Sequence, residues 1–113
     1  MTNIHLTQQK CVACEGGVSP LTITEAEALL VQIPDWHLTE DGTVLYRDYQ
    51  CANFMSAVTF LNQVGEIAEQ EGHHPDLHLT NYKHVRIALT THAISGLSQN
   101  DFIVAAKIDQ LGT

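Results

Sequence analysis

The chain has 113 residues, a formal net charge of −8 and 44% hydrophobic residues. This composition indicates one globular domain rather than a disordered chain, and the negative charge disfavours binding to nucleic acid or to anionic membranes. No apolar run approaches the roughly 18 residues that a membrane span needs, and the three cysteines form no disulfide framework. We therefore expect a protein of the cytoplasm, a reducing compartment.

The beginning of the chain is polar and carries two adjacent glycines and a proline. We expect residues 1–21 to form a flexible or loosely docked arm, followed by a single domain over residues 22–113. Cys11 and Cys14 lie in this arm at a spacing that also occurs in zinc and redox sites. One such pair supplies only two of the four ligands of a structural zinc ion, so we expect neither role.

A helix and a hairpin are expected after the arm. Thr24 and Glu27 have the spacing of a capping box, and Pro34 ends the helix that follows, because the residue before a proline avoids helical angles. Residues 36–38 and 44–49 have the composition of strands and flank an Asp-Gly turn. That dipeptide supplies the positive backbone angles of a tight hairpin.

The second helix has the strongest pattern in the chain. It is expected from about residue 53 to residue 71, with Gly72 as its C-terminal cap. Its apolar residues repeat at helical spacing along one stripe, which Phe60 and Ile67 widen: Phe54, Val58, Leu61, Val64 and Ala68.

Two more strands and a last helix complete the expected fold. Apolar and polar residues alternate over 77–80 and over 84–90, which predicts strands with one buried face, Leu77 among the buried residues. Ser98 and Asp101 have capping-box spacing before a final helix. The order of elements predicts an α+β fold in two layers: a four-stranded antiparallel sheet with helices packed on one face.

Histidine is concentrated in one part of the sequence, since five of the seven lie between residues 73 and 92. His73 and His74 precede Pro75 in the turn after the long helix, and His92 follows the last strand. Imidazole exchanges protons near neutral pH, and a well-placed acid or base accelerates a reaction about 10²–10⁴-fold. If the strand ends converge, these histidines could share the proton transfers of an elimination reaction without a metal.

A set of residues with fixed gaps resembles the signature of pterin-4a-carbinolamine dehydratases: Glu69, His73, His74, Pro75, Tyr82, His92 and Asp101. The tripeptides TTH, ending at residue 92, and GLS, beginning at residue 96, resemble the same family. The resemblance covers about residues 69–111, and weaker similarity extends back to the first helix. The chain departs from vertebrate members at some positions, such as Gly72 before the histidine pair, and there it is similar to bacterial members.

The resemblance implies a hydro-lyase that removes water from 4a-hydroxytetrahydropterin and gives quinonoid dihydropterin, recycling the cofactor of aromatic amino acid hydroxylases. It assigns acid/base roles to His73 and His92, a pterin-orienting role to His74, and supporting roles to Glu69 and Asp101. The other positions implied to lie against the pterin are Gly72, Pro75, Thr90, Thr91, Ala93 and Trp36. The pterin is the substrate, so no cofactor or metal is implied, and a homodimer or homotetramer is expected.

Structural roles compete with several of these assignments. Asp101 could serve only as a helix cap, Glu69 as a solvated helix residue and Trp36 as a core residue. A non-catalytic dimerisation cofactor of a transcription factor, a role of vertebrate members, is an alternative function. A metal-dependent hydrolase is favoured less, because adjacent histidines lack the i, i+4 spacing of a helical zinc pair. The remaining histidines are expected at the surface: His5, His37, His78 and His84.

Overall fold

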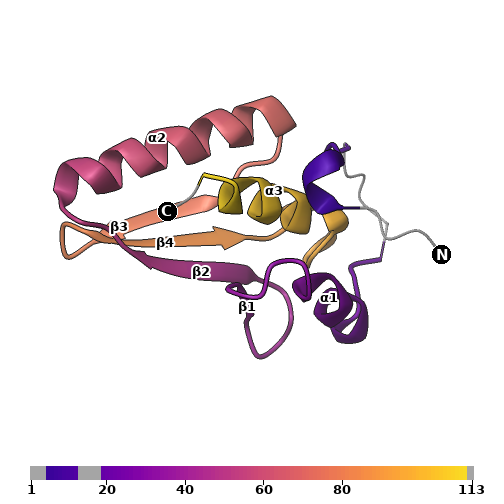
Figure 1. Ribbon diagram of the computed structural model, residues 1–113. Helices are drawn as coiled ribbons and strands as arrows, with labels where there is room; N and C mark the ends of the chain where they lie inside the picture. The colour runs from indigo at the N-terminus through magenta and orange to yellow at the C-terminus, as the bar shows by residue number, and fades with distance from the viewer. Residues whose placement is uncertain (1–4, 13–18, 112–113) are drawn as a thin grey trace.

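The computed structural model describes residues 5–12 and 19–111. Helices pack on one face of a four-stranded antiparallel sheet whose strand order is β1-β2-β4-β3 (Figure 1). The elements follow in chain order: η1 (Leu6–Gln8), α1 (Ile23–Leu30), β1 (His37–Leu38), β2 (Leu45–Gln50), α2 (Phe54–Glu71), β3 (Asp76–Thr80), β4 (His84–Leu89), η2 (His92–Ile94) and α3 (Gln99–Asp109). The α+β fold class expected from the sequence is confirmed.

The first helix begins earlier than expected. The Thr22 hydroxyl accepts the Glu25 N–H at 3.1 Å, and the Glu25 carboxylate accepts the Thr22 N–H at 2.9 Å. The capping box expected at Thr24 and Glu27 is therefore wrong: both pairs have the same spacing, and the local pattern cannot choose between them. The hairpin is confirmed, since β1 and β2 pair antiparallel and Gly42 in their turn has a φ of 72°.

The long helix α2 has the expected ends, but only part of the expected apolar stripe is buried. Asn53 caps its start by accepting the Ser56 N–H at 2.8 Å. Phe54, expected in the buried stripe, is 49% exposed. Val64 and Ala68 are buried as expected. The complete row that packs inward is Ala57, Phe60, Val64 and Ala68.

The strands differ in burial because they differ in place. The central strand β4 buries Val85, Ile87 and Leu89, as its alternation predicts. On the edge strand β3, however, Leu77 is 41% exposed, so its expected burial is wrong. An edge strand has a neighbour on one side only, and alternation alone cannot distinguish an edge from a centre.

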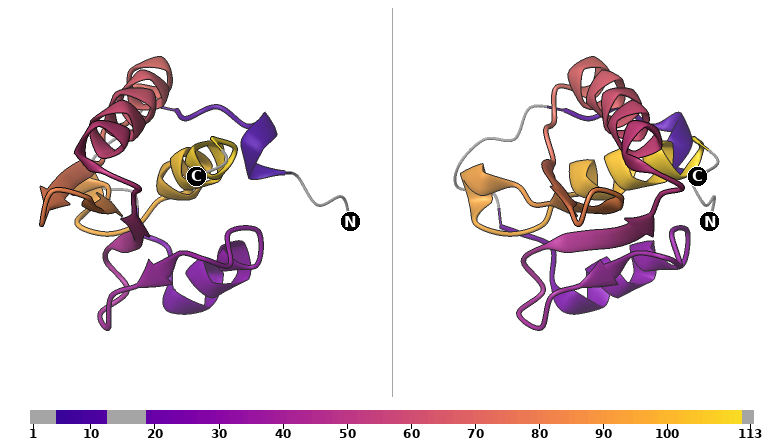
Figure 2. Two further views of the ribbon diagram at one scale, coloured as in Figure 1. Left: turned by 60° about the vertical axis from the view of Figure 1, so that its left-hand side comes forward. Right: turned by 90° about the vertical axis from the view of Figure 1, so that its left-hand side faces the viewer.

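The helix α3 is buried nearly all round, because the N-terminal segment covers the side that faces away from the sheet (Figure 2). Leu6 in this segment is buried with the hydrophobic core. Residues 5–12 of the expected arm are thus packed on the domain, and the division of the chain at residue 22 stays a prediction. Cys14, the second cysteine of the pair, lies outside the described residues.

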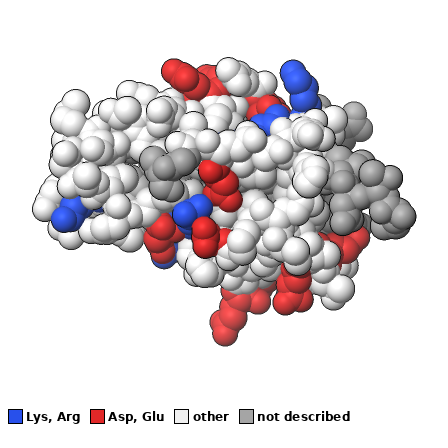
Figure 3. Space-filling view, viewed as in Figure 1, with Lys and Arg blue, Asp and Glu red and all other residues white. Residues whose placement is uncertain are grey.

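Surface charge follows the composition. Figure 3 shows acidic side chains along the lower edge of the view, in the region of α1 and the β1–β2 turn. In the part of the chain that the structure describes, no helix is both long and apolar enough to cross a membrane.

Candidate active site

The register of β3 and β4 brings the two histidine segments to one end of the sheet. Asp76, the first residue of β3, pairs with Ala88 near the end of β4. The turn with His73 and His74 leads into β3, and the loop with His92 leaves β4. Convergence of the two segments is therefore a consequence of antiparallel pairing.

The end of α2 fixes the backbone of the histidine pair. Gly72 adopts a left-handed conformation with φ 64° and ψ 27°. Its N–H bonds the Glu69 carbonyl at 3.3 Å, and the His73 N–H bonds the Ala68 carbonyl at 3.2 Å. This is the Schellman arrangement, in which a glycine reverses the chain at little steric cost. His73 therefore leaves the helix in a defined direction.

His73 meets Asp101, which lies in the first turn of α3. Asp101 is 0% exposed, and its Oδ1 lies 2.6 Å from His73 Nε2. Its Oδ2 accepts the Thr91 hydroxyl at 2.8 Å and the Ser98 N–H at 3.0 Å. Three donors thus converge on one buried carboxyl group. Because a carboxylate only accepts hydrogen bonds, Nε2 of His73 is the donor in this contact, and in the neutral ring the lone pair then lies on Nδ1.

Thr91 joins the second histidine segment to the same carboxylate. Its hydroxyl donates to Asp101, so it accepts from the Ser98 hydroxyl 2.8 Å away, since a hydroxyl has one hydrogen. His92 follows directly and is exposed at the start of η2. The segments of His73 and His92 therefore share one hydrogen-bonded centre at Asp101.

The loop after β4 is held in place by its own backbone. Thr91 and Gly96 pair as an isolated antiparallel bridge, which closes residues 92–95 into a tight loop that includes exposed Ala93. The Thr90 hydroxyl donates to a carbonyl of the β1–β2 turn at 2.6 Å. The loop that presents His92 is thus tied to two parts of the fold.

His74 points from the same turn into solvent. Its side chain is 62% exposed, and its Nε2 lies 3.2 Å from Oε2 of Glu69, which is also exposed. An exposed pair of this kind contributes little to stability. Pro75 is half-buried and leads into β3.

Trp36 does not join this cluster. It is buried in the core, and its Nε1 donates to Asp109 Oδ1 at 2.8 Å. Asp109 ends α3, whereas Asp101 lies in its first turn, and the helical rise places them about 12 Å apart along the axis.

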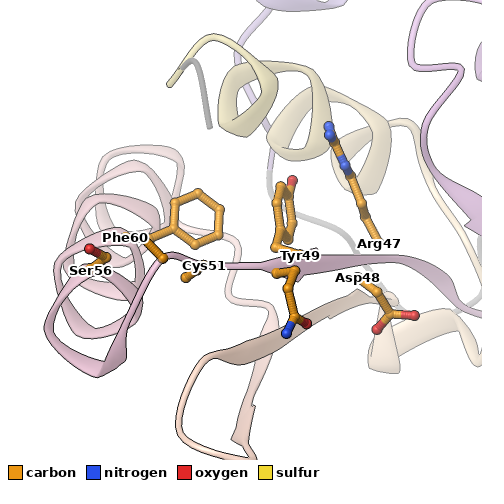
Figure 4. Close-up of a pocket in the computed structure, with 8 residues that line it drawn as sticks. Arg47, Asp48, Tyr49, Cys51, Ser56 and Phe60 are labelled. Carbon is orange, nitrogen blue, oxygen red and sulfur yellow. The ribbon is translucent and has the colours of Figure 1, made fainter.

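A hollow of about 450 Å³ lies elsewhere, between β2 and the start of α2 (Figure 4). Arg47 and Tyr49 contribute to it from β2, and Ser56 and Phe60 from α2. Burial raises the pKa of Tyr49, and within the described residues its hydroxyl is buried without a hydrogen-bond partner. None of the residues that line the hollow is a histidine. The candidate residues His73 and His74 follow the opposite end of α2.

One aspect of the site was missed by sequence reasoning. The bond from the Ser98 N–H to Asp101 is the expected helix cap, whereas the contact of the Ser98 hydroxyl with Thr91 was not expected. The capping-box spacing located Ser98 and Asp101, but not their link to Thr91 in the segment after β4. Within residues 5–12 and 19–111, no group of three or more His, Cys, Asp or Glu side chains is arranged to hold a metal ion.

These features define an α+β protein in which a buried carboxylate binds a histidine of one turn and the residue before a histidine of another. The family model described as Pterin 4 alpha carbinolamine dehydratase matches residues 19–111. The chain belongs to the pterin-4a-carbinolamine dehydratase family, as the sequence motifs predicted.

Full-length relatives and a solved structure agree with this membership. Two proteins named "Putative pterin-4-alpha-carbinolamine dehydratase" are each 48% identical to this chain. The one from Halorhodospira halophila covers 96% of this chain and 99% of its own. The one from Methylococcus capsulatus covers 98% and 96%. The crystal structure of a transcriptional coactivator/pterin dehydratase from Brucella melitensis superimposes with a TM-score of 0.76 at 25% identity, covering 84% of this chain and 100% of that one.

Proposed function

We propose that the protein is a pterin-4a-carbinolamine dehydratase, which eliminates water from 4a-hydroxytetrahydropterin and releases quinonoid dihydropterin. The observation that carries this proposal is the convergence of His73 and Thr91, the residue before His92, on the Asp101 carboxylate. Membership of the family supports it. In this role the protein would restore the pterin that an aromatic amino acid hydroxylase leaves hydroxylated.

Elimination requires two proton transfers. The C4a–O bond breaks as a proton joins the departing hydroxyl, and a proton leaves ring nitrogen N5 as the C4a–N5 double bond forms. In the proposed mechanism His73 accepts the ring proton through Nδ1, because Asp101 holds Nε2 in its protonated form. His92 protonates the leaving hydroxyl, and its exposure lets it recover a proton from water.

The proposed pterin contacts surround these two histidines. His74, oriented by Glu69, is proposed to bind the heterocycle. Thr90 and Thr91 are proposed to contact the pterin through backbone groups, because their hydroxyls already bond within the protein. Gly72, Pro75 and Ala93 complete the proposed set. Trp36 is left out, because it is buried beside the other end of α3.

A stopped-flow assay of 4a-hydroxytetrahydropterin dehydration tests the proposal. We expect His73→Ala and His92→Ala each to lower kcat by about 10²–10⁴-fold, the usual contribution of a placed acid or base. His78→Ala is the matched control, since His78 is an exposed histidine of β3, and it should keep the wild-type rate. Near-wild-type rates in both site variants would reject the proposed roles.

We also propose a homodimer or homotetramer located in the cytoplasm. Phe54 and Met55 at the start of α2 are both exposed, and a small domain gains stability by covering such residues. Cys11 and Cys51 are free thiols, as in a reducing compartment. Light scattering should show a particle mass that is a multiple of the chain mass, and Met55→Glu should lower it. An unchanged mass in this variant would exclude the start of α2 as the subunit interface.

A further inference from the structure

The N-terminal segment of residues 5–12, here called the strap, lies across α3 (Figure 2). At one end Leu6 is buried in the core, and its N–H bonds the Gln32 side-chain oxygen at 3.0 Å. At the other end Cys11 and Val12 reach the end of α2 and the start of α3. The strap is therefore attached at both of its ends.

Asn100 binds the second end of the strap through both groups of its amide. Its Oδ1 accepts the Val12 N–H at 3.1 Å, and its Nδ2 donates to the Val12 carbonyl at 2.6 Å. Asn100 is buried and directly precedes Asp101 on α3. A pair of opposed hydrogen bonds to one residue fixes orientation as well as distance.

Glu71 binds the same end of the strap from α2. Its Oε1 accepts the Cys11 N–H at 2.9 Å, and its Oε2 binds Lys107 Nζ of α3 at 2.5 Å. Burial alone would raise the pKa of Glu71, but hydrogen bonds from Lys107 and from Cys11 bring it below its ordinary value. Glu71 is therefore a carboxylate that joins α2, α3 and the strap.

We propose that the strap is a positioning device for the active site, which holds His73 against Asp101 by tying Glu71 to Asn100. Glu71 lies two residues before His73, and Asn100 lies one residue before Asp101. The two anchors therefore flank the 2.6 Å contact between imidazole and carboxylate on both sides. Glu71 and Asn100 act through their neighbours, so they are positioning residues.

Loss of an anchor should lower kcat more than it changes KM. A displacement of about 1 Å at a reacting group can cost about 10²-fold in rate, while exposed pterin contacts would remain. This kinetic expectation rests on the proposed dehydratase function. A second readout is independent of that function. The proton between His73 Nε2 and Asp101 should give a strongly downfield NMR resonance, which is lost when that contact loosens.

Asn100→Ala and Val12→Pro test the strap from opposite sides. Asn100→Ala removes both hydrogen bonds between the Asn100 side chain and Val12. Val12→Pro removes only the one that the Val12 N–H donates to Asn100 Oδ1. We expect both to lower kcat about tenfold with KM within about twofold, and to weaken the downfield resonance. Gln99→Ala is the control, because the exposed Gln99 donates to the side chain of Gln9 and not to the end of the strap at Val12, and it should behave as wild type.

A folded Asn100→Ala protein with wild-type kcat and an unchanged resonance would overturn the proposal. Should Asn100→Ala fail to fold by circular dichroism, the same outcome in Val12→Pro decides, since Val12 is 73% exposed and α3 is left intact. If the wild-type protein shows no dehydration at all, the proposed function fails, and the resonance alone decides the role of the strap.

Discussion

Replacement of Asp101 by asparagine perturbs the centre of the proposed site with almost no change in size. An amide keeps one acceptor oxygen and exchanges the other for an NH₂ donor. Three donors, from His73, Thr91 and Ser98, then face a single acceptor. We expect the amide oxygen to stay with Thr91 and Ser98, where it keeps two hydrogen bonds, and the amide nitrogen to face His73.

This orientation reverses the tautomer of His73. Its Nε2 must now accept, so the ring proton moves to Nδ1, the atom proposed to take the proton from the substrate. Loss of that base should lower kcat by about 10²–10⁴-fold. The variant also makes its three hydrogen bonds through a neutral group in place of a charged one, which should cost about 1.5–3 kcal/mol in total. For a domain of this size we expect a fall in Tm of about 6–12 °C.

Stopped-flow dehydration and thermal unfolding measure the two effects separately. Asp48→Asn is the control, because Asp48 binds Arg86 through two hydrogen bonds of 2.8 and 2.9 Å on the exposed face of the sheet. Surface ion pairs contribute about 0–1 kcal/mol, so this variant should keep its kcat and nearly its Tm. A wild-type kcat in Asp101→Asn would refute the tautomer argument, and an equal loss in both variants would show a non-specific effect.

Gly72→Ala should lower the free energy of unfolding by about 1 kcal/mol in denaturant titrations, because the residue has a φ of +64°; an added Cβ itself meets no atom within 4 Å. An unchanged stability would contradict the left-handed helix end. Cys11 should resist iodoacetamide at neutral pH until the protein unfolds, because burial, assisted by the Glu71 carboxylate, raises its pKa to about 12; rapid alkylation of the native protein, detected by mass spectrometry, would exclude this. Glu71→Gln should be less stable than wild type at neutral pH but not in acid: a lowered folded-state pKa contributes stability above the unfolded value of about 4.3 and loses it as pH falls through the folded value. A stability difference that is constant across pH would argue against this charge effect.

Local chemistry in the sequence predicted those parts of the fold that neighbours along the chain decide. The Asp-Gly turn requires a positive φ at Gly42, and the end of α2 requires one at Gly72, so both were found in advance. The start of α1 was misplaced because two capping pairs compete within three residues. The exposure of Leu77 depends on which strand forms the edge of the sheet, and no local pattern contains that information.

The candidate site was predictable in its residues but not in its connections. The histidines and Asp101 follow from their spacing and from the family resemblance. The strap does not, because its anchors join residues far apart in sequence: Cys11 to Glu71 across 60 positions, and Val12 to Asn100 across 88. Such contacts depend on tertiary packing. The composition of α3 does not show that the polar strap covers this helix.

The central claim is that imidazoles from two separate segments enclose one flat heterocycle, and an NMR titration with a non-reactive tetrahydropterin analogue tests it most directly. We predict that the ring resonances of His73 and His92 shift together with a single midpoint, while those of His78 and His84 on the sheet stay fixed. Shifts of His73 and His92 with different midpoints, or shifts confined to the sheet histidines, would contradict the account.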